Sequence, residues 1–394
     1  MSKVKTRILV ISDTHGAVPF FSTFPFPMGL TPKSMKSRGF SLETKSPFFR
    51  YPLPEADILL HCGNLTLHSD PHEFSQTLAV LRQHSAPLKL FIAGNHDTIL
   101  DKNFTSSSSS AARQRGLLDF EERDRKRVHD LIEDARQSGV HYLTEGSYTF
   151  NLTNGAVFKI YASPWTPRNG RWAFQYEGAH QFKIPNSVDV VMTHGPPWGI
   201  CDAITEEGDG GVGSNSRLKE RAGCRYLMQA IARAKPQLHC FGHIHEAWGA
   251  VCTYWDDEAA SSASGPRQGP GASLGQTDLL FDLKWLQTEA EVDGRLLFEL
   301  SRQCGILLDL TDSWTKKDLT DSWARKDLTD SWTKKDLIDR STKKDLTESR
   351  TEKETLFVNA AIMDTEHRPT QVPFVIDLEL PEFKRTEMPN ILND

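Results

Sequence analysis

The sequence predicts an α/β fold in which short buried strands alternate with amphipathic helices. Two observations predict it. Short apolar runs recur along the chain, and each is followed at once by Asp, Asn or His. Stretches with apolar residues at helical spacing lie between several of these runs. Parallel sheets built from such units bind ligands at the carboxyl ends of their strands, so we expect the polar residues to converge on one edge.

The first strand contains Ile8-Leu9-Val10-Ile11 and leads into Ser12-Asp13-Thr14-His15-Gly16. The run is apolar and rich in β-branched residues, and Gly16 marks its end. If the strand stays extended through its last residues, Asp13 and His15 project to the same side. A carboxylate and an imidazole that face one point are the beginning of a divalent-metal site. Taken alone, the pair is more often a turn cap and a surface histidine.

The next elements alternate between strand and helix. Residues 17–54 are rich in Phe, Pro and Ser without a period, and we expect a long loop over the fold. Alternating residues on both sides of Asn154-Gly155 predict a β-hairpin. The remaining elements expected in this half are strands at 57–64 and 88–97, helices at 72–84 and about 118–137, and the hairpin at 147–161.

The second half adds two strands with terminal histidines and two closing strands. His194 follows the run from Val188 to Thr193, and Gly242-His243-Ile244-His245 follows the run that starts at Leu238. The other features expected here are a Gly-rich loop at 207–214, a helix at about 221–234, and strands at 355–361 and 374–378 that return the chain to the sheets.

A low-complexity insertion separates the closing strands from the rest. The stretch 257–276 has a linker composition, 279–308 has apolar groups indicating partial order, and a nine-residue unit, Asp-Leu-Thr-Asp-Ser-Trp-Thr-Lys-Lys, repeats over 309–353. Nine residues are two and a half helical turns, so successive copies point to opposite sides and form no single apolar stripe. We favour a solvated, largely disordered or transiently helical insertion over a partner-binding module. The predicted divisions are 1–254, main domain; 255–354, insertion; and 355–394, strands that complete the domain.

Composition excludes several classes of protein. A net charge of -6 provides no basic field for nucleic acid, and the six cysteines contain no Cys-x-x-Cys pair. No apolar run is long enough to span a membrane, and the start of the chain passes into a strand without a signal-peptide core. We therefore expect a cytoplasmic or nuclear protein that binds neither nucleic acid nor a membrane.

The polar strand ends, read in order, form a set of motifs. They are Asp-x-His (13, 15), Gly-Asn (63, 64), Gly-Asn-His-Asp (94–97), Thr-His-Gly (193–195) and Gly-His-Ile-His (242–245). This set resembles the calcineurin-like metallophosphoesterase superfamily. Four details resemble its MPPED-type, class III cyclic-nucleotide-phosphodiesterase-like subgroup: Ser-Pro-Trp-Thr-Pro, Thr-His-Gly-Pro-Pro, Gly-His-Ile-His-Glu and the late Leu-Phe-Val-Asn-Ala. The match covers about residues 5–250 and 355–385.

The resemblance implies a four-layer α/β/β/α sandwich with two divalent metal ions at its rim. Oxygen and imidazole ligands suit Mn, Fe or Zn. His96 would donate to the phosphoryl oxygen or the leaving group, and Asn95 would share in catalysis. The implied metal ligands are Asp13, His15 and His245 for the first ion, Asn95, His194 and His243 for the second, and position 64 as the bridge.

The departure from the family pattern is Asn64, where the family has an aspartate. An amide is a poor bridge, so we expect one tightly and one weakly bound metal. The expected function is hydrolysis of phosphodiesters or phosphomonoesters by a metal-bound hydroxide, attenuated by Asn64.

The alternative is a catalytically silent relative that serves as a binding or scaffold protein, with the 309–353 repeats as its protein-binding arm. The substrate is expected to be a small phosphoester. Several large side chains either line a pocket for a base or aryl group or pack within their loops: Trp165, Arg168, Arg171, Trp172 and Trp198.

Overall fold

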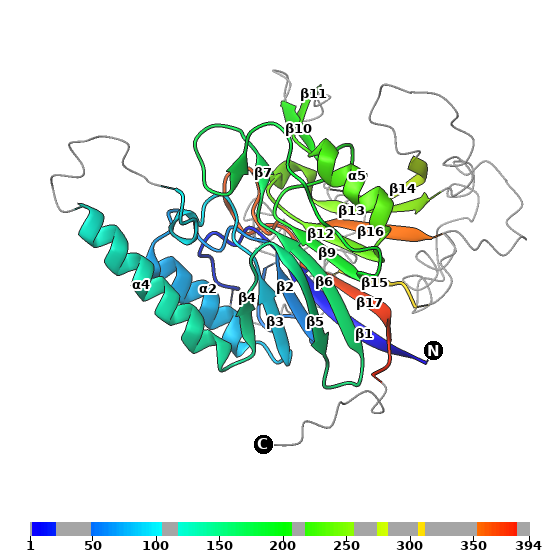
Figure 1. The fold of residues 1–394 in the computed structure, drawn as a ribbon, viewed down its shortest axis with the longest axis horizontal. Coiled ribbons are helices and arrows are strands. Elements are labelled where there is room, and N and C mark those ends of the chain that lie inside the picture. The colour runs from blue at the N-terminus through cyan, green and yellow to red at the C-terminus, as the bar shows by residue number, and fades with distance from the viewer. Residues whose placement is uncertain are drawn as a thin grey trace, which may run out of the picture.

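The computed structural model describes residues 2–20, 49–104, 117–206, 217–255, 274–282, 306–311 and 353–383. Two β-sheets and the helices that flank them make up these residues (Figure 1). Three sequence-based expectations lie wholly or mostly outside them: the loop at 17–54 beyond Phe20, the Gly-rich loop at 207–214, and the repeats beyond Thr311.

The first sheet has six strands and contains the N-terminal strand near its middle. Strands β1 to β4 are parallel, β17 is antiparallel to β1, and β15 is parallel to β17. Their order is β15 (Ile306–Asp309), β17 (Phe374–Pro381), β1 (Lys3–Ile11), β2 (Ile58–His61), β3 (Leu88–Phe91) and β4 (Val140–Tyr142).

The second sheet has seven strands with four parallel strands at its centre. Their order is β14 (Leu274–Asp282), β13 (Gly249–Trp255), β16 (Glu354–Asn359), β12 (Leu238–Phe241), β9 (Val190–Thr193), β6 (Val157–Ser163) and β5 (Gly146–Asn151). The predicted hairpin is confirmed, since β5 pairs antiparallel with β6 around Asn154-Gly155. Two short two-stranded sheets join β7 (Thr166–Pro167) to β8 (Gln175–Tyr176) and β10 (Ala203–Glu206) to β11 (Arg217–Arg221).

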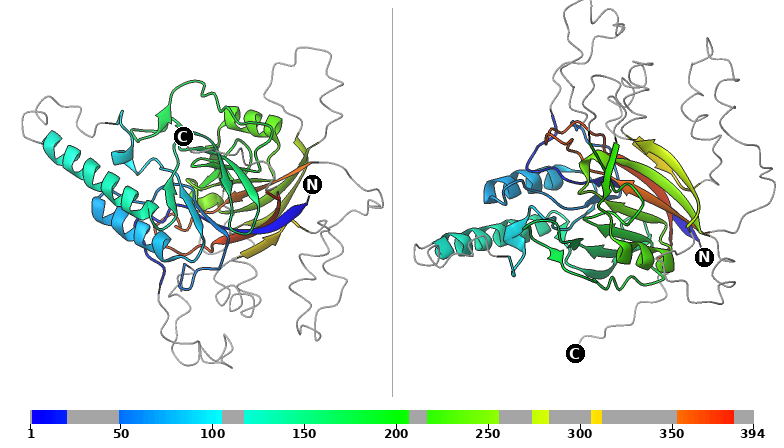
Figure 2. Two further views of the ribbon diagram at one scale, coloured as in Figure 1. Left: turned by 60° about the horizontal axis from the view of Figure 1, so that its bottom comes forward. Right: turned by 90° about the horizontal axis from the view of Figure 1, so that it is seen from above.

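Alternation along β1 shows how the layers form. Ile8 and Val10 are buried in the core between the two sheets, whereas Leu9 and Ile11 are buried in the cluster that includes helix residues. Helices α2 (Pro71–Gln83) and α4 (Leu117–Arg136) cover this outer face of the six-stranded sheet. Helix α5 (Arg225–Ala234) covers the outer face of the seven-stranded sheet. The four-layer α/β/β/α sandwich is therefore confirmed (Figures 1 and 2).

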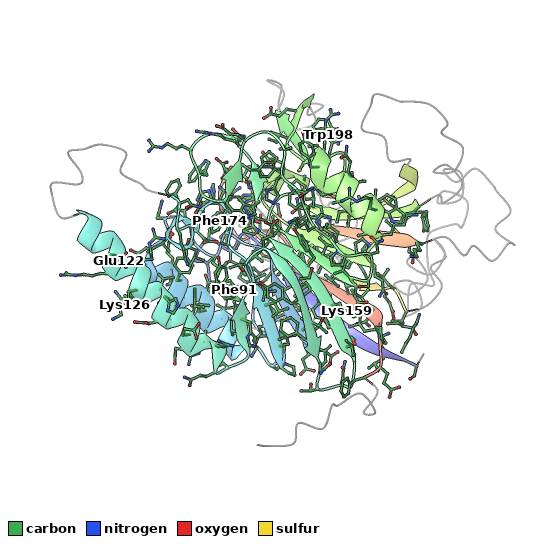
Figure 3. All side chains as sticks on the ribbon, viewed as in Figure 1. Phe91, Glu122, Lys126, Lys159, Phe174 and Trp198 are labelled. Carbon is green, nitrogen blue, oxygen red and sulfur yellow. The ribbon has the colours of Figure 1, made fainter. Side chains whose placement is uncertain are left out.

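The cap of α2 and the buried side of α4 agree with their sequences. Asp70 caps the first turn of α2, and Glu73 closes a capping box with it. On α4, Val128 is buried in the core, whereas Figure 3 shows Glu122 and Lys126 projecting from the exposed face. Within the described ranges, no helix is both long and apolar enough to cross a membrane.

The C-terminal strands and part of the insertion belong to the two sheets. Strand β16 pairs with β12, and β17 pairs with β1. Strands β14 and β15, which lie inside the predicted insertion, form the edges of the two sheets. Asp309, the first residue of the first repeat, pairs with Lys5 at 2.6 Å, and Leu310 packs against the core. Strand β14 begins at Leu274, so the last residues of the predicted linker at 257–276 belong to a strand.

Candidate metal centre

The polar residues of the predicted motifs lie at the carboxyl ends of five parallel strands. Strands β1, β2 and β3 supply residues from one sheet, and β9 and β12 supply residues from the other. A bridge between Ser12 and Ala361 joins the two sheets at this edge. Asp13 and His194 are fully buried there, although one is a carboxylate and the other an imidazole. Buried polar groups such as these require hydrogen-bond partners or a bound ion.

The backbone brings these residues together by a route that the sequence did not reveal. Strand β1 ends at Ile11, and Asp13 and His15 have φ angles of +52° and +47°. The expectation of an extended strand through His15 is therefore wrong, since both residues adopt the left-handed conformation. Asn64 and His243 adopt it as well, with φ angles of +55° and +71°. Non-glycine residues reach this region at a cost of roughly 1–2 kcal/mol each, and such residues cluster at functional sites.

The first candidate position is formed by Asp13, His15 and His245, whose ligand atoms all lie within 4.8 Å of one another. The Asp13 Oδ1 atom is 3.6 Å from His245 Nε2 and 3.9 Å from His15 Nε2. The Nδ1 atoms of the two histidines lie 3.0 Å from the carbonyl oxygens of Thr66 and Asp364. A carbonyl can only accept, so each Nδ1 carries hydrogen, and each imidazole presents the Nε2 lone pair in its neutral form. Burial opposes protonation of His245, but its contacts with Asp13 raise its pKa.

The electrostatics of the first position also suit a cation. Among the described residues, the buried His15 Nε2 finds no hydrogen-bond partner, and burial lowers the pKa of His15 to about 2. Burial opposes ionisation of Asp13, but the surrounding imidazoles hold its pKa well below the usual value. A neutral imidazole with an unused lone pair beside an ionised carboxylate is the donor set that a divalent ion requires. The residues at this position therefore fit a metal ion.

The second candidate position is formed by Asn95, His194 and His243. His194 Nδ1 lies 2.9 Å from the carbonyl oxygen of Cys62, so its Nε2 is again the free lone pair in the neutral imidazole. That Nε2 lies 2.8 Å from Asn95 Oδ1, and the two atoms are both acceptors. Neighbouring ligands of one ion are about 3 Å apart when each metal–ligand bond is about 2.1 Å. The ring of His243 lies 4.9 Å from that of His194, and burial lowers its pKa to about 3.

Asn64 separates the two positions and presents amide hydrogens to both. Its Nδ2 donates to Asp13 Oδ1 at 2.8 Å and to Asn95 Oδ1 at 3.4 Å. Its Oδ1 accepts from the backbone N–H of His96 at 2.9 Å. Turning the amide over would place its NH₂ against this N–H, so the backbone of His96 fixes the orientation. The residues therefore fit two sets of ligands but do not fit a bridge between them.

Two glycines allow the strand ends to approach this closely. A Cβ atom on Gly94 would lie 2.3 Å from Asn64 Oδ1, and one on Gly242 would lie 2.0 Å from Asp13 Oδ2. The same Oδ2 accepts from the backbone N–H of His243 at 2.8 Å. Glycine is therefore required at these two positions, because Asn64 packs directly against Gly94 and Asp13 packs directly against Gly242.

Asp97, the last residue of the Gly-Asn-His-Asp motif, holds two of the ligand-bearing loops together. Its buried carboxylate accepts from the backbone N–H groups of Leu65, Thr66 and Gly94 and from the Thr66 hydroxyl. Burial raises its pKa to about 6. All of these partners belong to the loops after β2 and β3, so Asp97 contributes to the geometry of these loops.

His96 occupies the mouth of the site. Its Nδ1 lies 2.8 Å from the Leu67 carbonyl oxygen, and burial lowers its pKa. Trp172, which is 44% exposed, lies beside it with ring centroids 4.3 Å apart. The other large side chains considered from the sequence lie elsewhere: Trp165 packs on Phe174, Trp198 lies under the Arg225 guanidinium, Arg168 pairs with Glu177, and Arg171 is exposed.

A cavity of about 250 Å³ opens over the two positions. Sequence reasoning missed three of the residues that line it: Glu246, Thr365 and His367. Glu246 directly follows the last histidine motif, which was the available signal. Thr365 and His367 lie in the loop after β16, and the only signal was that β16 is another predicted strand. The full lining is Asn64, Asn95, His96, His243, His245, Glu246, Thr365 and His367.

Comparisons with known proteins agree with this geometry. The family model for calcineurin-like phosphoesterases matches residues 6–247. Human metallophosphoesterase domain-containing protein 1 is 28% identical over 210 residues, which cover 50% of this chain and 57% of that protein. The UPF0046 protein T07D4.2 of Caenorhabditis elegans is 32% identical over 218 residues, covering 51% of this chain and 48% of that protein.

A third relative shows how local the similarity is. A probable rhamnogalacturonate lyase C of Emericella nidulans is 32% identical over 209 residues, which cover 52% of this chain but 17% of that protein. The matched part of the chain thus spans about half the length of the human and Caenorhabditis elegans relatives and 17% of the length of the Emericella nidulans protein. The residues that match the family model, 6–247, contain the strand ends described above and make up more than half of the chain. Its relatives are consistent with the MPPED-type subgroup, and the chain belongs to the calcineurin-like phosphoesterase family.

Proposed function

We propose that this protein is a metal-dependent hydrolase of small phosphodiesters or phosphomonoesters. The family and the triad of Asp13, His15 and His245 support a metal-dependent phosphoesterase. The observation that carries the proposal is the buried His15 Nε2, which has an unused lone pair beside an ionised carboxylate. Divalent ions held by such donors polarise phosphoryl oxygens and activate water for in-line attack.

Three side chains of the site are proposed to act on the substrate or the second ion. The Leu67 carbonyl oxygen accepts from His96 Nδ1–H and orients the ring, so Nε2 is the atom left to contact the substrate, and it gives a proton to the leaving group when the ring carries both protons as an imidazolium. Asn95 is proposed both to hold the second ion and to share in catalysis. The exposed face of Trp172 lies next to His96, where an aryl or nucleobase leaving group would stack.

Asn64 is proposed to attenuate this activity. Its amide hydrogens contact the oxygen atoms of Asp13 and Asn95 that would hold the first and the second ion. The second position also has no carboxylate of its own. We therefore propose one tightly bound ion at Asp13, His15 and His245 and one weakly bound ion at Asn95, His194 and His243, with Mn, Fe or Zn as the metals.

The orientation of Asn64 also favours a second candidate function. If the amide excludes the second ion altogether, the protein is a catalytically silent member of the family that binds a ligand or a partner. A protein partner for the repeats at 309–353 belongs to this second proposal. For either function, we propose that the protein acts without a nucleic-acid or membrane partner.

The test is metal content together with turnover. The purified full-length chain is expected to contain or take up about one equivalent of Mn²⁺ tightly and to be stabilised by it in a thermal-shift assay. Excess Mn²⁺ should then raise slow hydrolysis of bis(p-nitrophenyl) phosphate or p-nitrophenyl phosphate. A chain that contains no metal and shows no shift with Mn²⁺ would overturn the metal site. Tight metal binding without hydrolysis of either ester or of cyclic nucleotides would favour the silent protein.

A further inference from the structure

The loop between β16 and β17 adds an imidazole to the site that the family motifs do not contain. His367 lies in this loop, and its ring centroid is 5.0 Å from that of His15 and 5.3 Å from that of His245. It also faces His96 at 6.4 Å. The side chain lines the cavity and is itself exposed. One residue of the C-terminal loop is therefore in contact with the first candidate position and open to a ligand.

The loop is built to hold His367 in place. The Asp364 carboxylate accepts from the backbone N–H groups of Glu366 and Arg368 at 2.9 and 3.0 Å and from Arg368 Nε at 2.9 Å. The carbonyl oxygen of Asp364 accepts from the backbone N–H of His367 and from His245 Nδ1, both at 3.0 Å. The same peptide oxygen therefore fixes a candidate metal ligand and His367. His367 has a φ angle of +55°, a conformation that costs a non-glycine residue stability.

The cavity needs donors for an anion. A phosphoester carries one or two negative charges, yet no Lys or Arg is among the described residues that line the cavity. Of the lining side chains outside the candidate ligand and catalytic residues, only Thr365 and His367 can donate a hydrogen bond, since Glu246 is a carboxylate. The ring of His367 is not one of the three groups whose ligand atoms lie within 4.8 Å of one another. This arrangement suits a contact with the substrate better than a further metal ligand.

We propose that His367 binds the phosphoester, donating a hydrogen bond to a phosphoryl oxygen over the first metal position. His367 and His96 both line the cavity, with ring centroids 6.4 Å apart, so one phosphoryl oxygen bound there is within hydrogen-bonding reach of both rings. This inference rests on the proposed phosphoesterase function. Its distinct content is that the loop after β16, and not only the five strand ends, binds the substrate.

The experiment compares three variants of the full-length, Mn²⁺-loaded chain. His367→Gly removes the side chain and keeps the left-handed backbone accessible, whereas His367→Asn keeps both that backbone and an N–H donor. His129→Gln, at an exposed position on α4, is the matched control. The probe is inorganic phosphate, and its Kd is measured by calorimetry beside the Kd of Mn²⁺. Thermal melting reports whether each variant is folded.

His367→Gly is expected to weaken phosphate binding roughly tenfold, to raise KM by a similar factor and to leave the Mn²⁺ Kd and kcat within about twofold. His367→Asn should recover part of the loss, and His129→Gln should change nothing. An unchanged phosphate Kd in folded His367→Gly, a Mn²⁺ Kd that weakens instead, or no phosphate binding by the unaltered protein would each overturn the inference. A protein that binds phosphate through His367 but hydrolyses no ester would overturn the proposed function alone.

Discussion

The two candidate metal positions are built from the same edge of the sandwich but are satisfied in different ways. At the first, Asp13 supplies a carboxylate and the His15 Nε2 atom is buried without a partner in the described chain. At the second, Asn95 and His194 face each other with acceptor atoms 2.8 Å apart, and none of the three candidate ligands is a carboxylate. Asn64 donates amide hydrogens to both sides. The two ligand sets therefore differ in charge, because the first contains a carboxylate and the second does not, and Asn64 contacts both.

A matching contact between a buried histidine and a threonine lies next to each of the two positions. His61 Nε2 and the Thr14 hydroxyl are 2.9 Å apart next to the first position, and His239 Nε2 and the Thr193 hydroxyl are 2.9 Å apart next to the second. Within the described residues, the Nδ1 atom of each of these buried histidines has no partner. Thr14 and Thr193 are next to Asp13 and His194 in the sequence, so each histidine–threonine pair, here called a support, holds the backbone beside a candidate ligand. The supports differ in the charge nearby, because Asp13 favours protonation of His61, whereas burial alone shifts the pKa of His239.

The largest effect is expected when the first position loses its carboxylate. Asp13→Asn keeps the side-chain shape but removes the only negative charge that the candidate ligands supply. We expect Mn²⁺ affinity to fall by about a hundredfold or more, measured by calorimetry on the folded variant. Asp130→Asn on the exposed face of α4 is the control and should bind Mn²⁺ normally. Unchanged affinity in Asp13→Asn would show that the tight ion lies elsewhere.

The next largest effect is expected when the shared position regains a carboxylate. Asn64→Asp removes the amide hydrogens that face Asp13 and Asn95, and it adds the charge that a bridge requires. We expect metal occupancy to rise to two and phosphodiesterase activity to rise at least about tenfold, roughly 1.4 kcal/mol in the barrier. If occupancy rises to two while a weak activity stays constant, the missing bridge does not limit turnover. If the variant stays inert on cyclic nucleotides and aryl phosphates, the silent function becomes the better proposal.

A smaller effect, on the pH dependence of stability, should distinguish the supports beside the two positions. Burial lowers the pKa of His61 to about 4 and that of His239 to about 3. Because both values lie below the unfolded value near 6.5, the folded chain binds fewer protons. Each group then contributes stability that is complete above pH 6.5 and is lost as the pH falls toward its folded pKa.

Denaturant unfolding at a series of pH values measures this loss. Replacing either histidine with Phe should flatten the dependence below pH 6.5 by up to about 1.4 kcal/mol per pH unit. The flattening should extend to lower pH for His239→Phe than for His61→Phe, since Asp13 favours protonation of His61. His129→Gln, at an exposed site, provides the reference slope. Identical slopes in all variants would show that neither support stays neutral in the folded chain.

The smallest effect is expected from the part of the repeats between Thr311 and Lys353, which lies outside the described residues. Residues 312–352 separate the described ends at Thr311 and Lys353, and a short Gly-Ser linker in their place closes a shorter loop at a lower entropic cost. The deletion is confined to this stretch because β14 and β15 form sheet edges. Melting temperature and both metal affinities should stay within the error of the unaltered chain. An unfolded deletion product would show that the repeats belong to the core.

Several features could be predicted from the sequence because they depend on local patterns. Apolar periodicity and turn residues predicted the ligand-bearing strands, the two closing strands, the helices α2, α4 and α5 and the hairpin at Asn154-Gly155, and the structure places them close to the expected bounds. Strands β4 and β13 and the two short two-stranded sheets were not predicted. The glycine, asparagine and histidine motifs at the strand ends also predicted which residues would meet. The edge strands β14 and β15 were not predicted as strands, because their pairing partners β13 and β17 decide their structure.

The sequence by itself thus determined the α/β class, the order of the ligand-bearing strand ends and the loss of a carboxylate at position 64. Tertiary structure alone decided how those groups face one another. The left-handed backbone of Asp13 and His15 cannot be inferred from a strand pattern, since it is stabilised by contacts with residues 63 and 64 of another segment. The amide orientation of Asn64 is set by the N–H of His96, and His367 reaches the site through a loop held to His245. Such directions depend on hydrogen bonds between distant segments, which a local pattern does not encode.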